Sequence, residues 1–292
     1  MARLTRRKFL IGGGLVAAGT LAFGHPALFE PYHPQLVREE FVLPRLPEEF
    51  DGFTIAHLSD FHCHDDLSHI PIQRAVDIVN RVSPDLVVLS GDFVTVSFLS
   101  DYLHDEKKSA HQAERCAGLL SALRSRLGSV AVLGNHDVES DPHVVTEALQ
   151  AQNITVLRND SHPVERGSKR LWFCGLDSLD ARPNIDVTLK EVPKDEPAIL
   201  LVHEPDFADQ AVRYPIDLQL SGHSHGGQVW IPGIGAPWLP DNARKYPRGR
   251  YQVGKLPLYT NIGLGTLRVP VRVNCTPEVT LVTLRAGGSK IG

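Results

Sequence analysis

Two histidines stand one residue apart in a glycine-rich stretch of this 292-residue chain. The stretch reads LQLSGHSHGGQVW over residues 218–230, and it places His223 and His225 directly after an apolar run. Histidine and glycine seldom serve a packed core together, whereas a neutral imidazole nitrogen is a common ligand for transition metals. The stretch therefore predicts metal ligands, provided that residues of the same chemistry end other strands of the chain.

Four further apolar runs end in residues that bind metals. In chain order these endings are Asp60-Phe61-His62, Gly91-Asp92, Gly134-Asn135-His136-Asp137 and His203-Glu204-Pro205. Any one of them alone fits an ordinary turn or a core histidine, but five in series are hard to explain as turns. Because ligand sites of α/β sheets form outside the carboxyl ends of the strands, we expect all five to converge on one crevice.

The donor types narrow the choice of metal. Imidazole nitrogen together with carboxylate oxygen suits Zn, Fe or Mn better than Ca or Mg. Asp92 has two carboxylate oxygens to share, so it could bridge two cations. The residues thus favour a transition-metal centre with room for a second ion.

Hydrophobic periodicity predicts the elements that must hold these residues. Apolar runs predict strands over residues 40–43, 53–60, 85–92, 129–137, 154–160, 170–177, 198–206, 218–225, 258–265, 271–275 and 278–285. Amphipathic spacing predicts helices over residues 71–82, 107–127, 142–151 and 207–213. Strands alternate with helices in the first half, and the second half is mostly strands. The pattern therefore predicts an α/β fold of two packed sheets with helices outside.

The composition is that of an ordinary soluble globular protein except at the N-terminus. Hydrophobic residues make up 42% of the chain and the formal net charge is -4, so no nucleic-acid partner is expected. Residues 1–24 join a basic head to an apolar run over 9–23, which favours an export signal. The string Thr5-Arg6-Arg7-Lys8-Phe9-Leu10 resembles a twin-arginine signal, which predicts the twin-arginine export machinery as a partner. The alternative is that residues 9–23 stay as an uncleaved membrane anchor.

The rest of the chain divides into three parts. Residues 25–49 are rich in proline and predict a tether that ends in an edge strand. Residues 50–285 hold all five motifs and predict a single domain, and residues 286–292 form a tail. We expect the protein in the periplasm or cell envelope, either released or held at the membrane surface.

The five motifs in this order resemble the calcineurin-like metallophosphoesterase superfamily. Its signature runs D-x-H, G-D, G-N-H-[DE], a lone H and G-H-x-H, and every part is present within residues 50–285. The resemblance implies a four-layer α-β-β-α sandwich of two mixed sheets flanked by helices. It also implies a metal-dependent phosphoric ester hydrolase, in which a hydroxide shared by two metal ions attacks a phosphate diester or monoester.

The resemblance also implies a role for each motif residue. It gives one metal to Asp60, His62 and His225, a second metal to Asn135, His203 and His223, and the bridging position to Asp92. His136 would protonate the leaving oxygen or steady the phosphate. Asp137 would orient His136, and the two ions would be Mn, Fe or Zn.

Two features go beyond the shared signature. Position 64 is a histidine where many members of the superfamily have glycine, so His64 could touch substrate or face solvent. Residues 226–237, 244–251 and 261–266 resemble a branch of exported or membrane-associated bacterial phosphoesterases. The stretch 244–251 contains four basic residues: Arg244, Lys245, Arg248 and Arg250. They could hold a second phosphate or anionic lipid heads, or they could form a solvated loop.

The expected substrate is a phosphorylated small molecule or a lipid-linked phosphate, and the alternatives differ in class. A lipid pyrophosphohydrolase of the UDP-2,3-diacylglucosamine type would face the cytoplasm, where that substrate is made. A metal-holding binding or scaffold protein would have no turnover, and the presence of His136 beside a full ligand set argues against it. A structural metal site is closed and needs no spare histidine.

Overall fold

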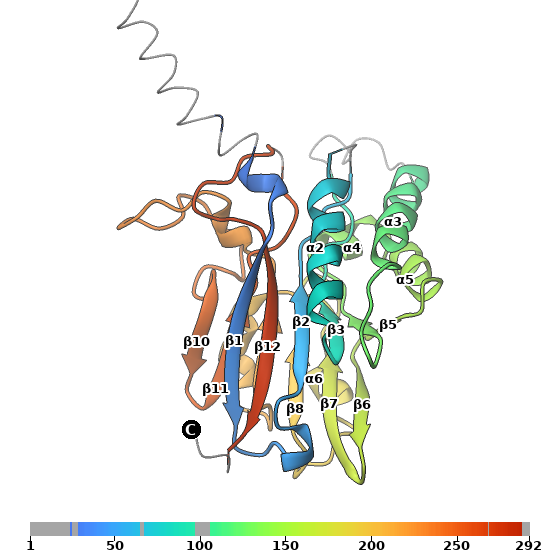
Figure 1. Cartoon of the computed structure of the whole chain (residues 1–292), viewed down its shortest axis with the longest axis vertical. Helices are drawn as coiled ribbons and strands as arrows, with labels where there is room; N and C mark the ends of the chain where they lie inside the picture. Colours follow the sequence, from blue (N-terminus) through green and yellow to red (C-terminus); the bar gives the residue numbers. More distant parts are fainter. Residues whose placement is uncertain (1–23, 25–28, 65–66, 97–105, 268, 288–292) are drawn as a thin grey trace, which may run out of the picture.

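Two six-stranded sheets pack face to face, and helices cover their outer faces (Figure 1). The computed structural model describes residues 24, 29–64, 67–96, 106–267 and 269–287. This architecture is the expected four-layer α-β-β-α sandwich of two mixed sheets, so the predicted fold class is confirmed. The predicted export signal over 1–24 and the anchor over 9–23 lie outside the described residues, apart from Gly24.

The first sheet holds the first and the last strand of the fold side by side. Its order is β1 (Gln35–Leu43), β12 (Glu278–Ala286), β2 (Thr54–Leu58), β3 (Leu86–Leu89), β4 (Ser129–Ala131) and β5 (Ile154–Val156). β2 to β5 run parallel, β12 runs antiparallel to β2, and β1 runs parallel to β12. The edge strand predicted over 40–43 is present but begins at Gln35, because every residue from there to Leu43 pairs with β12.

The second sheet has a parallel centre and an antiparallel strand at each edge. Its order is β10 (Gly249–Val253), β11 (Leu256–Thr260), β9 (Leu218–Ser221), β8 (Ala198–Leu201), β7 (Lys169–Gly175) and β6 (Asp160–Arg166). β11, β9, β8 and β7 run parallel, whereas β10 and β6 form hairpins with β11 and β7. β6 was not predicted, because its sequence DSHPVER has no apolar alternation and carries a proline, which an edge strand tolerates.

Helices complete the outer layers. The α-helices are α2 (His69–Val82), α3 (Glu106–Leu120), α4 (Asn135–Ser140), α5 (Pro142–Gln150), α6 (Ile185–Thr188) and α7 (Ala208–Ala211), and the short 3-10 helices are η1 (Glu30–Tyr32), η2 (Glu48–Phe50), η4 (Pro205–Phe207) and η5 (His225–Gly227). α2 buries Ile72, Ala75 and Val79 against the first sheet, as its spacing predicts. No helix among the described residues is long and apolar enough to cross a membrane.

Several predicted elements are shorter in the structure, and two of the predicted strands give way to loops before the metal-binding residue types. The strand expected over 218–225 ends at Ser221, and the strand expected over 129–137 ends at Ala131. The helix expected over 107–127 ends at Leu120. The stretch 271–275 forms no strand of a sheet, and only Val273 makes an isolated bridge, with Val229.

Three apolar layers hold the sandwich rigid. Phe53, Val88 and Phe173 belong to the layer between the two sheets. A second layer lies between the first sheet and its helices, and a third lies between the second sheet and α7. The four cysteines are buried free thiols. Because the parallel strands of both sheets end on the same side, their loops meet at the upper end of the molecule in Figure 1.

Candidate metal centre

The metal-binding residue types predicted from the sequence meet in the loops at this end. The loops after β2, β3 and β4 come from the first sheet, and the loops after β8 and β9 come from the second. Three groups of side chains place their ligand atoms within 4.8 Å of one another: Asp60, His62 and His225; His62, Asp92 and His136; Asp92, His203 and His223. The predicted convergence of the five motifs is therefore present in the structure.

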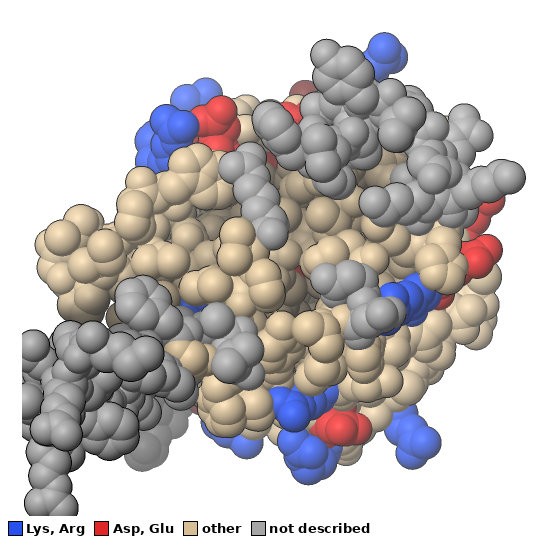
Figure 2. All heavy atoms as spheres, turned by 90° about the horizontal axis from the view of Figure 1, so that it is seen from above, with Lys and Arg blue, Asp and Glu red and all other residues tan. Residues whose placement is uncertain are grey.

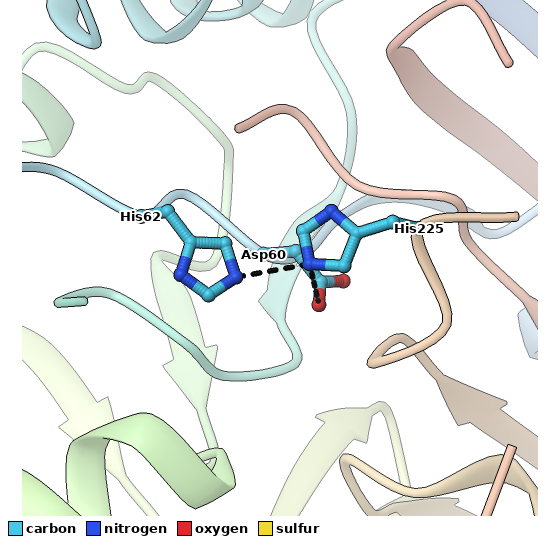
Figure 3. A group of neighbouring side chains, drawn as sticks. All are labelled: Asp60, His62 and His225. Atoms are coloured by element: carbon cyan, nitrogen blue, oxygen red, sulfur yellow. Dashed lines mark hydrogen bonds and ion pairs between the residues drawn. The ribbon is translucent and has the colours of Figure 1, made fainter. Parts of the chain in front are cut away.

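The first group joins loops from both sheets (Figure 3), because Asp60 and His62 follow β2 and His225 follows β9. His62 Nε2 is 2.9 Å from His225 Nε2, and His225 Nε2 is 3.3 Å from Asp60 Oδ1. All three side chains are buried and point toward one another. Two imidazole nitrogens at this separation fit one ion, since each Zn–N bond is about 2.1 Å long. The donor set resembles the one that the sequence assigned to the first metal.

Asp92 belongs to both of the other groups. Asp92 Oδ2 is 3.1 Å from His203 Nε2 and 3.5 Å from His62 Nε2, so it lies between the two groups. The amide oxygen of Asn135 is buried and has no hydrogen-bond partner among the described residues. A buried oxygen without a hydrogen-bond partner destabilises the folded state unless a ligand binds to it. Asn135 thus has the free donor atom that a metal ligand needs.

Three of the four candidate ligand histidines have a lowered pKa. Burial lowers the pKa of His62 and His225 well below the usual histidine value, and lowers that of His223 to about 3. Burial alone would raise the pKa of Asp92 and lower that of His203, but the attraction between these two groups outweighs burial, so the pKa of Asp92 is lowered and that of His203 is raised. A cation bound at His203 would therefore displace a proton, whereas the other three rings offer neutral nitrogens.

The backbone of the ligand loops is strained. Positive φ angles occur at Asp60 (53°), His62 (45°), Asp92 (58°), His223 (70°) and His225 (51°). Residues with side chains rarely adopt this left-handed conformation, and such residues cluster at functional sites. Five candidate ligands in this region indicate that the strained backbone, which lowers the stability of the fold, is needed to orient these side chains.

Gly134 lets the loops after β3 and β4 approach each other. A Cβ at this position would lie 2.6 Å from the backbone nitrogen of Asp92, closer than real Cβ contacts. The glycine of the Gly-Asn-His-Asp motif is therefore needed for space. Because Gly134 has no side chain, the two loops can approach closely enough to place Asn135 and Asp92 in the same site.

The resemblance led us to expect that Asp137 orients His136, but the two side chains have different partners. The Asp137 carboxylate accepts hydrogen bonds from the backbone N–H groups of Gly134, Asp92, Phe93 and Val94. The ring of His136 instead accepts a hydrogen bond at Nδ1 from the N–H of Val96, 3.1 Å away. Asp137 thus fastens the loop after β3 to the start of α4.

His64 turns back toward the chain. Its Nδ1 lies 2.6 Å from the carbonyl oxygen of His62, and the residue belongs to none of the three groups of ligand atoms. It lines a small cavity of about 90 Å³ together with Tyr32, Leu67 and Pro270. This position supports the backbone beside a candidate ligand, and the predicted substrate contact stays a prediction.

The four basic residues have four different partners. Arg244 pairs with Asp241, and Lys245 pairs with Asp209. Arg248 stacks over Trp230, and Arg250 on β10 donates to the carbonyl oxygen of Glu40. The predicted contact of these residues with a second phosphate or with anionic lipid heads stays a prediction.

Sequence reasoning missed Arg272, a fully buried cation behind the site. Its guanidinium donates to the carbonyl oxygens of Ile262, Gly263, Gly265 and Cys275. The loop that it holds packs beneath Asp60, whose carbonyl oxygen accepts from the N–H of Gly265. An arginine between two valines was the available signal, because such a position in a strand-like run is normally apolar.

The fold and the site together define a metal-dependent phosphoester hydrolase. The model of the calcineurin-like phosphoesterase family matches residues 53–227, and the chain belongs to this family. It is 35% identical to the metallophosphoesterase YkuE of Bacillus subtilis (strain 168), over 98% of this chain and 99% of the relative. It is 29% identical to the phosphodiesterase YaeI of Escherichia coli (strain K12), over 96% and 99%.

The similarity to solved structures is more distant. The calcineurin-like phosphoesterase YfkN from Bacillus subtilis matches with a TM-score of 0.48 and 13% identity, over 74% of this chain and 82% of that chain. The family binds a dinuclear divalent metal centre, and the candidate ligands for such a centre are present here.

Proposed function

We propose that the protein hydrolyses phosphodiesters with two metal ions held by the loops at the carboxyl ends of its two sheets. The observation that carries this proposal is the position of Asp92, whose Oδ2 lies close to both His62 and His203. A carboxylate shared by two ligand groups is what a dinuclear hydrolase needs. Similarity to the phosphodiesterase YaeI supports a diester as the substrate.

The chain's own residues would divide the work as follows. Asp60, His62 and His225 would hold one ion, Asn135, His203 and His223 the other, and Asp92 both. When bound, the ions would activate a water and offset the negative charge of the phosphate. The Val96 N–H donates to Nδ1 of His136, which leaves Nε2 as the ring nitrogen that can donate a hydrogen bond. Nε2 would donate to the leaving oxygen and stabilise the negative charge that develops there.

Metal content and turnover of the full chain and of Asp92→Asn test this proposal. We expect about two ions per wild-type chain, because one carboxylate serves both ligand groups. The variant should lose at least about a hundredfold in turnover, since even changes outside the ligand shell cost 10–100-fold. Asp177→Asn is the matched control, because Asp177 is a buried carboxylate that pairs with Arg158 instead.

A substrate panel separates the proposed reaction from its rivals. The wild-type chain is assayed with a phosphodiester, a phosphomonoester and a UDP-sugar pyrophosphate under the same conditions. Preference for the pyrophosphate would replace the proposal with the lipid pyrophosphohydrolase, and two metals without turnover would favour a binding or scaffold protein. A folded protein that retains no transition metal after incubation with Mn, Fe or Zn ions would contradict the assignment of the metal centre.

We also propose that the folded protein is exported by the twin-arginine route and acts in the cell envelope. The support is the Arg6-Arg7 pair before the apolar run over 9–23. With both arginines replaced by lysine, cell fractionation should find the chain in the cytoplasm. Unchanged export of that variant would contradict this route.

A further inference from the structure

A long uncharged loop borders the metal centre. Residues 229–240 read VWIPGIGAPWLP and contain no charged side chain. The loop begins just after His225 and ends beside Asp241, whose carbonyl oxygen lies 2.9 Å from His223 Nε2. Both of its ends therefore touch segments that carry candidate ligands.

The loop turns its apolar side chains outward. Ile234 is 78% exposed and Trp238 is 57% exposed. The base of the loop is nevertheless well held: Ile231 and Gly235 form an antiparallel bridge, and Val229 bridges to Val273. An ordered loop that exposes large apolar groups in this way marks an interaction surface.

Two neighbouring segments extend this apolar surface. The side chain of Gln228 hydrogen-bonds the backbone of Leu267, which joins the loop to a turn where Val269 is 56% exposed. The start of the described chain is tied to the same region, because the Glu30 carboxylate accepts from the N–H of Cys275. The adjacent Phe29 is 49% exposed.

The figures show the same arrangement. In Figure 1 the orange loop projects sideways from the upper end of the molecule, close to η1. In Figure 2, which looks down on that end, a lobe drawn without Lys, Arg, Asp or Glu protrudes on the same side. The charged residues visible in this view lie around the margin of the face. An uncharged projection with a charged margin is the pattern of a surface that enters an apolar phase.

We propose that loop 229–240 inserts into a lipid bilayer and holds the metal centre against the membrane surface. The occupant follows from the chain that leads to this surface: an apolar run over 9–23, preceded by a basic head, stands just before Phe29. A run of that kind partitions to lipid, and it would bring the loop to the same bilayer. Tryptophan and isoleucine side chains are suited to the interface. The docking surface does not depend on the proposed reaction.

Tryptophan fluorescence of the full chain on vesicles tests the insertion. The chain has three tryptophans, of which Trp230 and Trp238 lie in the loop and Trp172 is buried in the outer core. Vesicles of phosphatidylglycerol and phosphatidylcholine with brominated acyl chains should quench the loop emission of the wild-type chain. In Ile234→Asp the inserted fraction should fall on the order of tenfold, because a charge replaces an isoleucine that would contact the acyl chains.

The control is Val187→Asp on α6, because Val187 is 51% exposed but lies outside the three segments. This control should be quenched like the wild type, and both variants should keep wild-type metal content and turnover of a soluble phosphodiester. A vesicle-bound wild-type chain without quenching would overturn the proposal, as would equal quenching in Ile234→Asp. An unquenched dimer that Ile234→Asp converts to a monomer would assign the surface to a second copy of the chain instead.

Discussion

His136 is the residue whose replacement separates stabilisation of the leaving oxygen from metal binding. Its ring meets the ring of His62 edge-on at 4.9 Å, and Val96 occupies its Nδ1. His136→Gln should keep both ions but lower kcat by about a hundredfold or more, because the leaving oxygen loses the hydrogen-bond donor that this ring places beside it. The measurement is metal content together with kcat for a series of aryl phosphodiesters.

The dependence on the leaving group distinguishes a hydrogen bond to the leaving oxygen from a positioning role. Weakly basic leaving groups need little stabilisation, so the loss in His136→Gln should grow as the leaving group becomes more basic. An equal loss across the whole series would instead indicate that His136 positions the phosphate. Loss of metal would place the residue among the ligands.

At the scale of elements, the loop between β11 and β12 supports Asp60 from below. Gly263 in this loop has φ of 75°, and a Cβ there would lie 2.5 Å from the Cβ of Asp60. Gly263→Ala should therefore displace Asp60, lower the metal content and reduce turnover by about tenfold or more. Metal analysis and steady-state kinetics measure these effects.

Gly128→Ala is the matched control for that prediction. Gly128 has a similar φ of 82° but no heavy atom within 4 Å of the added Cβ. Both substitutions introduce backbone strain, which costs about 1–2 kcal/mol for a residue in the left-handed conformation. Only Gly263→Ala should lose metal, and equal metal content in the two variants would contradict the support of Asp60 by this loop.

The sequence predicted the elements with clear hydrophobic patterns and the motifs at their ends. Continuous apolar runs identify β3 and β8 because both faces of these strands are buried. The convergence of their endings follows from a general rule on where parallel strands place their ligands. These two facts together predict the metal centre without any knowledge of side-chain positions.

Tertiary contacts decided what the sequence could not predict. Asp137 and His136 are adjacent in the chain, but consecutive helical residues do not share a face, so Asp137 serves backbone donors instead. The four basic residues of 244–250 are likewise separated by their individual partners. Neither outcome has a signature in local spacing.

At the scale of the whole molecule, the metal centre joins the two sheets. Asp60, His62 and Asp92 come from the first sheet, and His203 and His225 come from the second. Ions that bind only the folded chain should stabilise it by about 2.7 kcal/mol at a hundredfold excess over Kd. Removal of metal by a chelator should therefore lower Tm by several degrees, on the order of 2–4 °C per kcal/mol.

Differential scanning calorimetry of the chain with and without chelator checks this prediction. Asp92→Asn should melt at nearly the same temperature in both conditions, because it binds metal poorly from the start. An unchanged Tm of the wild-type chain after confirmed loss of metal would show that the apolar layers alone hold the sheets together.

The pairing of β1 with β12 bears on how the chain is made. A ribosome releases the chain from its N-terminus at about 5–20 residues per second, so β1 has no partner strand until residues 278–286 emerge. β2, which leads into Asp60 and His62, pairs with β12 on its other side and keeps one open edge for the same period. Such an edge is prone to pair wrongly. The nascent chain therefore completes the sheet behind its metal pocket only after residues 278–286 have been made, and we expect metal loading to follow that step.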